Sequence, residues 1–255
     1  MKRIFMLLAP LALMLVAAMA LSGVAQAAPV GSKADAQCLT LAIQTLGPGF
    51  KPSNYAFHGG TAGNDNFTGQ GTEGKGDVFC GFGGDDSIDT LGGGDIFIGG
   101  AGNDSVTGNT YNGGTGTFYG GDGNDTVYDN DGTFNGGAGD DSVLNYNAGD
   151  FFGGDGNDSV VTNLGPGHFN GDAGNDTVYD NYGTFNGSAG DDSVPHYNNG
   201  TFNGDAGDDS VSINAYIFNG GAGNDSVTQN FNTFNGGDGI DSVVTNNGGT
   251  LVDVP

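Results

Sequence analysis

The chain has 255 residues, of which 53 are Gly, 30 are acidic and only 5 are basic, so its formal net charge is −25. Nucleic-acid phosphates attract basic surfaces, so this composition excludes nucleic acid as a partner and favours a cationic one. A Gly-rich, highly charged chain is also typical of disordered proteins, and we expect that state for the chain without a ligand. The apolar residues, however, recur at fixed intervals, which favours a folded repeat protein.

The first 27 residues have the pattern of a secretory signal peptide. Lys2 and Arg3 precede an apolar run over residues 4–20, and Ala25-Gln26-Ala27 provides a cleavage site. The alternative, a retained membrane anchor, is weaker because the apolar run is only marginally long for a span. We therefore expect cleavage after Ala27, an extracellular protein with no membrane span, and a mature charge of −27 from 30 acids and 3 Lys.

Residues 28–57 form a leader without repeats, which we expect to cap the repeat array. An apolar stretch from Cys38 to Leu46 predicts one helix that ends at the turn of residues 47–49. Cys38 and Cys80 are the only cysteines of the chain. In a secreted protein such a pair favours a disulfide, here between the leader and the first coil, over two separate buried thiols.

Residues 58–255 repeat one phrase, clearest at residues 218–227, whose sequence is FNGGAGNDSV. Each copy has an Asp seven residues after a Phe and two residues before a Val, or an Ile in the first copy, so the step from Phe to Val is always nine residues. The ten aspartates are Asp86, Asp104, Asp125, Asp141, Asp158, Asp176, Asp192, Asp209, Asp225 and Asp241. The step from each Val to the next Phe varies.

The repeating unit is a nonapeptide, because Asp77, Asp86, Asp95 and Asp104 are spaced nine residues apart. Six residues rich in Gly and Asx predict a turn, and three residues around each Val predict a short strand with one side chain inward. Two units complete one coil. Stacked coils predict an all-β protein, a right-handed parallel β-roll of about ten coils, with facing columns of Val and Phe as its core.

The segment of constant length in each coil, from Phe to Val, predicts a cation site. Hard cations need several oxygen ligands, and a Gly-rich turn offers backbone carbonyls beside the Asp carboxylate. Nine divalent cations between ten stacked turns would change the mature charge from −27 to −9. The opposite turns carry Asn three residues after Val, which predicts a hydrogen-bonded ladder or a left-handed turn position. These asparagines are Asn130, Asn163, Asn181, Asn214, Asn230 and Asn246.

The nonapeptide Gly220–Thr228 resembles the calcium-binding repeat of the RTX (repeats-in-toxin, haemolysin-type) family. The resemblance implies several Ca²⁺ ions, held in the turns by Asp and backbone carbonyls, and disorder without calcium. The ten aspartates are the implied carboxylate ligands; Asp65 fits a start-up copy, and Asp77 and Asp95 fit an early row on the opposite side. The implied carbonyl ligands include Gly99, Ala101, Gly120, Asp122, Gly136, Ala138, Gly153, Asp155, Gly220 and Ala222.

The chain departs from the family pattern at two motif positions, where we expect altered calcium occupancy or affinity. Asp172, Ser188 and Asp205 replace Gly at the second position, and Ile240 replaces Asn or Asp before Asp241. Family toxins, proteases and lipases also carry a catalytic or pore-forming region upstream, for which this chain has no room. The resemblance therefore supports calcium binding and not toxin activity.

These features predict a secreted, non-catalytic calcium-binding protein that folds on extracellular Ca²⁺. We expect it to act as a structural or surface-interaction module, with a cell-surface or extracellular matrix polymer as partner. Paired acids such as Asp140-Asp141 recur along the repeat, unlike a unique acid–base site, so catalysis ranks third.

The main alternative is a calcium-shaped protein that binds glycan or ice. Tyr128, Tyr179 and Tyr197 are candidate glycan contacts. A row of Thr just before the Phe column favours ice binding but is interrupted at positions 150, 168 and 217. The row consists of Thr117, Thr133, Thr184, Thr201, Thr233 and Thr250.

Overall fold

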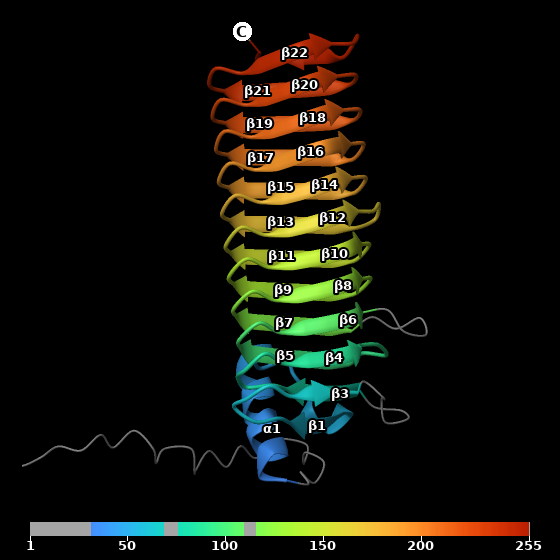
Figure 1. Cartoon of the computed structure of the whole chain (residues 1–255), viewed down its shortest axis with the longest axis vertical. Coiled ribbons are helices and arrows are strands. Elements are labelled where there is room, and N and C mark those ends of the chain that lie inside the picture. The colour runs from blue at the N-terminus through green and yellow to red at the C-terminus, as the bar shows by residue number, and fades with distance from the viewer. Residues whose placement is uncertain (1–31, 69–75, 110–115, 255) are drawn as a thin grey trace, which may run out of the picture.

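The computed structural model describes residues 32–68, 76–109 and 116–254. The predicted signal peptide, residues 1–27, lies outside the described residues. Within the described part, no helix is long and apolar enough to cross a membrane. The described residues form a rod of stacked coils, with one helix at its N-terminal end (Figure 1).

The helix α1 (Lys33–Leu46) begins earlier than the sequence predicted, because Ser32 and Asp35 form a capping box. Ser32 Oγ accepts the backbone N–H of Asp35, and the Asp35 carboxylate accepts the backbone N–H of Ser32. Gly47 ends the helix with a φ of 75°, which glycine adopts without strain. A short 3₁₀ helix, η1 (Pro52–Asn54), then leads into the first strand.

The helix is fastened to the first coils by a disulfide and a small apolar cluster. Cys38 bonds to Cys80, so the predicted pairing is confirmed. Around this bond Ala42 of the helix packs with Phe57 and Val78 of the first sheet, and all of these side chains are buried. The helix therefore packs on the outer face of the first two strands of the first sheet, on the side away from the Phe core, at the N-terminal end of the rod.

Two parallel β-sheets run the length of the rod, and the strands alternate between them along the chain. The first sheet has 12 strands in the order of the odd numbers from β1 to β23, and the second has 11 in the order of the even numbers from β2 to β22. Figure 1 shows the two kinds of strand stacked side by side up the rod. The predicted all-β solenoid of parallel coils is confirmed, with about 11 coils because the start-up copy after Asp65 adds β2.

Most strands have five or six residues, whereas the sequence predicted three. The first sheet contains β1 (Tyr55–Gly59), β3 (Gly76–Cys80), β5 (Ile96–Ala101), β7 (Thr117–Asp122), β9 (Thr133–Ala138), β11 (Asp150–Asp155), β13 (His168–Ala173), β15 (Thr184–Ala189), β17 (Thr201–Ala206), β19 (Ile217–Ala222), β21 (Thr233–Asp238) and β23 (Thr250–Val252). The second sheet contains β2 (Asn66–Phe67), β4 (Ser87–Thr90), β6 (Ser105–Asn109), β8 (Thr126–Asn130), β10 (Ser142–Asn147), β12 (Ser159–Asn163), β14 (Thr177–Asn181), β16 (Ser193–Asn198), β18 (Ser210–Asn214), β20 (Ser226–Asn230) and β22 (Ser242–Asn246).

The strands are longer because the motif glycines pair with neighbouring coils instead of forming a turn. Gly121 pairs with Gly137, for example, inside the ladder between β7 and β9. Only three residues, such as 223–225, then remain to connect β19 to β20. Backbone groups that pair in a ladder are satisfied without water, so this arrangement lets the coils stack closely.

The predicted columns of Phe and Val form the core. From Phe97 to Phe234 each ring stacks on the next, with centroids 4.6–5.1 Å apart and interplanar angles of 4–11°. These Phe side chains are fully buried, and the facing aliphatic side chains from Ile88 to Val227 are at most 2% exposed. The in-register coils therefore repeat one packing contact along the whole rod.

The predicted asparagine ladder is confirmed on the turns that follow the second sheet. Each Asn side-chain N–H donates to Oδ1 of the Asn in the next coil, mostly at 2.7–3.0 Å, and the asparagines from Asn109 to Asn230 are fully buried. The ladder also includes Asn147 and Asn198, four residues after Val, because β10 and β16 contain one extra residue. Most of these amides also donate to a carbonyl of a first-sheet strand in the next coil, as Asn130 of β8 does to Asp150 of β11, so the ladder joins the two sheets.

Candidate functional site

The ten motif aspartates form a single column along the turns that connect the first sheet to the second. In six of the ten copies two glycines at positive φ, such as Gly121 at 121° and Gly123 at 129°, reverse the chain so that the following Asp, here Asp125, points inward. All ten aspartates are at most 4% exposed. Buried carboxylates are rare unless they are paired or bind a metal, so the column requires a chemical explanation.

One oxygen of each carboxylate has a backbone partner. The backbone N–H of the Asp in one coil donates to Oδ1 of the Asp in the next coil, at 2.7–2.9 Å along the whole column. Asp65 starts the same series, because its N–H donates to Asp86 Oδ1 at 2.7 Å. Asp65 itself is less buried, and its Oδ2 accepts the backbone N–H of Thr61 at 2.6 Å.

The other oxygen, Oδ2, is buried without a hydrogen-bond partner in all ten aspartates. It faces the first glycine of its own motif. A β-carbon added to Gly120 would lie 1.9 Å from Oδ2 of Asp125 and 2.6 Å from the carbonyl oxygen of Gly136 in the next coil. This position therefore requires glycine, and a carboxylate oxygen and a carbonyl oxygen line the same small space between coils.

The structure separates the predicted carbonyl ligands into two groups. Carbonyls of the first motif position, including Gly99, Gly136, Gly153 and Gly220, lie beside the aspartate column. Carbonyls of the third position accept the N–H of the glycine at the fourth position of the preceding coil, as Ala138 does from Gly123 at 2.7 Å. The same holds for Ala101, Asp122, Asp155 and Ala222. The first group is therefore better placed to complete a cation site.

Burial and neighbouring carboxylates disfavour the charged form of the column. Burial is the main cause that raises the pKa of Asp125, Asp158 and Asp209 to about 8, and nearby carboxylates raise it further. The same cause raises the pKa of the other central members to about 6 or 7, namely Asp104, Asp141, Asp176, Asp192 and Asp225. In the described part of the chain, no Lys or Arg forms an ion pair with these groups. Either a proton or a bound cation must therefore neutralise them.

The donor set fits a hard cation only when backbone oxygens are counted. Among the described residues, no group of three or more Asp, Glu, His or Cys side chains gathers at one point. A site within the column would combine carboxylates of adjoining coils with first-position carbonyls. Oxygen-only sets of carboxylates and carbonyls are the ligands that Ca²⁺ prefers, so the residues present fit the calcium that the sequence implies.

Asp77 and Asp95 lie on the opposite side of the rod, as the sequence predicted, and form a column of two. The N–H of Asp77 donates to Asp95 Oδ1 at 2.9 Å, and His58 Nε2 lies 2.7 Å from Asp77 Oδ1. From Gly116 onward glycine occupies this position in most coils. Side chains of the asparagine ladder take up the space, since a β-carbon on Gly116 would lie 2.7 Å from Asn109 Oδ1.

The departures from the family motif have structural explanations. Asp172, Ser188 and Asp205 adopt φ values of 72–81°, so they hold a conformation that favours glycine. Phe82 at the same position of the first full copy, φ 75°, is a fourth departure that the sequence reasoning missed. Because Asp172 and Asp205 lie close enough to raise the pKa of Asp176 and Asp192, they add negative charge beside the column.

Ile240 ends a second, exposed ladder at the fifth motif position. There the backbone N–H of each coil donates to the Asn or Asp side chain of the preceding coil, as Asn124 does to Asn103 at 2.8 Å. Ile240 donates its N–H to Asn224 Oδ1 at 3.1 Å. Among the described residues, no later motif turn has a backbone N–H that would donate to the side chain at position 240.

Comparison with family models, with curated proteins and with solved structures gives no match for this chain. The class of molecule that the structure defines is therefore a parallel β-solenoid with a buried aspartate column. The likeness to the RTX repeat rests on the nonapeptide itself.

Proposed function

We propose that this protein is a secreted, non-catalytic calcium-binding repeat protein of the RTX type. The observation that carries the proposal is the row of ten buried aspartate Oδ2 atoms without a hydrogen-bond partner, each beside a motif glycine. Ten turns enclose nine gaps, so we propose about nine Ca²⁺ ions per chain. Bound calcium would supply the positive charge that the buried carboxylates lack.

In this proposal, different sets of residues bind the cations and keep the coils in register. The aspartates at 86, 104, 125, 141, 158, 176, 192, 209, 225 and 241 hold the cations with first-position carbonyls, and the Phe stack and Asn ladder keep the coils in register. Folding would follow the entry into calcium-rich extracellular fluid, because ligands that bind only the folded state stabilise it. The rod would then serve as a structural or surface-interaction module for an extracellular or cell-surface polymer.

One feature of the structure supports a non-catalytic role, and a second argues against ice binding. The acidic groups repeat identically in successive coils, whereas an acid–base site needs two carboxyl groups in different environments. The outward Thr row lies in register along the first sheet, but Asp150, His168 and Ile217 interrupt it. An ice-ordering face is therefore disfavoured, which leaves a glycan-binding surface as the alternative.

The proposal is tested by titrating CaCl₂ into the chelator-stripped mature chain at pH 7.5 and recording far-UV circular dichroism. We expect a cooperative change from coil to β-structure as calcium is added. MgCl₂ is the matched control, because Mg²⁺ demands stricter octahedral geometry and retains its waters. A spectrum of folded β-structure in the chelator, unchanged by calcium, would contradict the proposal.

A further inference from the structure

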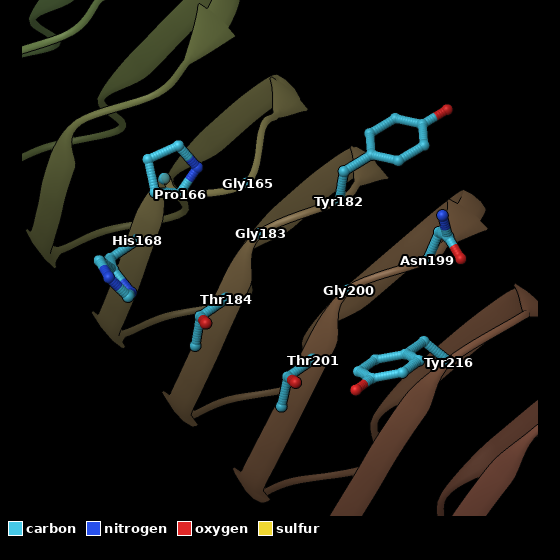
Figure 2. A pocket seen from close by; sticks show the side chains of 11 residues that line it. Gly165, Pro166, His168, Tyr182, Gly183, Thr184, Asn199, Gly200, Thr201 and Tyr216 are labelled. Atoms are coloured by element: carbon cyan, nitrogen blue, oxygen red, sulfur yellow. The ribbon is translucent and has the colours of Figure 1, made fainter.

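A groove lies on the edge of the rod opposite the aspartate column, across the turns that follow β12, β14 and β16 (Figure 2). Its volume is about 280 Å³. Gly167, Gly183 and Gly200 of three successive coils lie along its floor, and a β-carbon at Gly183 or Gly200 would clash with the carbonyl oxygen of the preceding glycine of this row. The groove therefore runs along the rod axis, from one coil to the next.

Changes in two turns mark the ends of the groove. The turn between β12 and β13 contains the additional residues Gly165 and Pro166, and Pro166 stands at one end in Figure 2. At the other end Tyr216 occupies the position that Gly183 and Gly200 have in the preceding coils. The groove is thus confined to a few coils, although the turns on this side are repeated along the rod.

The lining is uncharged, which is unusual in a chain with 30 acidic residues. None of the described residues that line the groove is Asp, Glu, Lys or Arg. Thr184, Thr201, Asn199 and His168 offer hydroxyl, amide and imidazole groups for hydrogen bonds. A metal ion would find no carboxylate here, and an anion would find no fixed positive charge in a protein whose overall charge repels it. The lining therefore suits a neutral, polar ligand.

Two tyrosines add exposed aromatic surface to these polar groups. Tyr182 is 43% exposed and Tyr216 is 47% exposed, and Asn199 lies on the coil between them (Figure 2). Neighbouring coils are about 4.8 Å apart, so the two tyrosines are separated by about 10 Å along the rod. Aromatic rings pack against the C–H faces of sugar rings while the sugar hydroxyls exchange hydrogen bonds with polar side chains.

We propose that this groove binds a linear neutral glycan, with successive sugar rings placed along the rod between Tyr182 and Tyr216. The proposal goes beyond calcium binding, because it requires only that the coils are folded. Thr184 and Thr201 would contact hydroxyls on one side of the sugar chain, and Asn199 those on the other. Figure 2 shows these side chains on opposite sides of the glycine floor.

The first test is isothermal titration calorimetry of the mature protein in saturating CaCl₂. The probes are the hexasaccharides of β-1,4-glucan, β-1,3-glucan, α-1,4-glucan and β-1,4-linked N-acetylglucosamine, with hexagalacturonate as the charged control. We expect at least one neutral probe to bind and the anionic probe not to bind. Absence of binding by all four neutral probes, or binding of hexagalacturonate alone, would overturn the proposal.

The second test uses variants that the chain itself shows to be compatible with the fold. Tyr216→Gly restores the residue found at positions 183 and 200, and Tyr182→Ala introduces the residue found at positions 148 and 215. Each should weaken binding of the neutral probe about tenfold, since it removes one aromatic contact. Circular dichroism should stay unchanged, which separates a loss of the groove from a loss of calcium-dependent folding.

Phe231→Ala is the matched control, because Phe231 is an exposed aromatic residue outside the groove at the turn position that Tyr182 occupies, and the preceding coil has Ala215 at this position. Binding by this variant should equal that of the unmodified protein. The proposal fails when Tyr216→Gly and Tyr182→Ala both bind normally, or when Phe231→Ala loses as much affinity as they do.

Discussion

In a chelator the protein should be most stable near pH 4 and should lose its β-structure as the pH rises to 8. Burial raises the pKa of Asp125, Asp158 and Asp209 to about 8 in the folded chain. An unfolded Asp has a pKa of about 3.9. The folded state therefore binds more protons than the unfolded state between these values, so its stability is fully present below about pH 4 and declines through pH 8. Thermal melts in EDTA at several pH values measure this directly.

Saturating calcium should reverse the direction of this pH dependence. Protons and Ca²⁺ compete for the same carboxylate oxygens, so the calcium-bound protein should become more stable as the pH rises from 4 to 7. The two series of melts are each other's control. A melting temperature in EDTA that is constant or rising across this range would show that the aspartate column is not the group that limits folding.

The substitution Asp158→Asn should have opposite effects with and without calcium. Asn keeps the Oδ1 that accepts the N–H of Asp141, and its amide replaces Oδ2 near the carbonyl oxygen of Gly171. In EDTA at pH 6 the variant should be more stable than the unmodified protein by about 1–3 kcal/mol, because it folds without taking up a proton at a buried site. In saturating calcium it should be less stable and bind about two ions fewer, since each Asp adjoins two gaps.

The neighbouring substitution Asp140→Asn provides the control for this comparison. Asp140 is exposed, and the corresponding positions in adjacent coils already carry Asn124 and Asn157. Its Oδ1 accepts the N–H of Asn157 at 2.8 Å, which Asn would preserve. We expect changes within about 0.5 kcal/mol in either condition. Equal effects of Asp158→Asn with and without calcium would mean that Asp158 acts only through its hydrogen bond.

The sequence could predict the columns because their spacing is fixed by packing. The same nine-residue segment from Phe to Val recurs in every coil, so its Phe residues align, as Phe118 does with Phe134, and each Asp falls at the same point of the turn. The asparagine ladder was predicted in part, through the three-residue step from Val. Asn147 and Asn198 were missed because one extra residue in β10 and β16 shifts the spacing without moving the side chain from the ladder.

Other features depend on contacts between coils, which spacing does not report. The strands extend through the motif glycines because the backbone of these glycines pairs with the next coil. The sequence did not predict this, since Gly and Asx residues are typical of turns. The hydrogen bond from each Asp N–H to the next Asp Oδ1 was equally invisible in the sequence. The groove was not predicted, because it depends on which turn residues of neighbouring coils lie side by side. The sequence alone does not show that Pro166 and Tyr216 lie beside the glycines of neighbouring turns.

The most direct test of the account is the number of calcium ions bound to the folded chain. We would saturate the mature protein with CaCl₂ at pH 7.5, remove free metal by gel filtration in a low-calcium buffer, and measure calcium per chain by inductively coupled plasma mass spectrometry. The account predicts about nine ions, one for each gap between the ten buried aspartates. A folded protein that retains one ion or none under these conditions would contradict it.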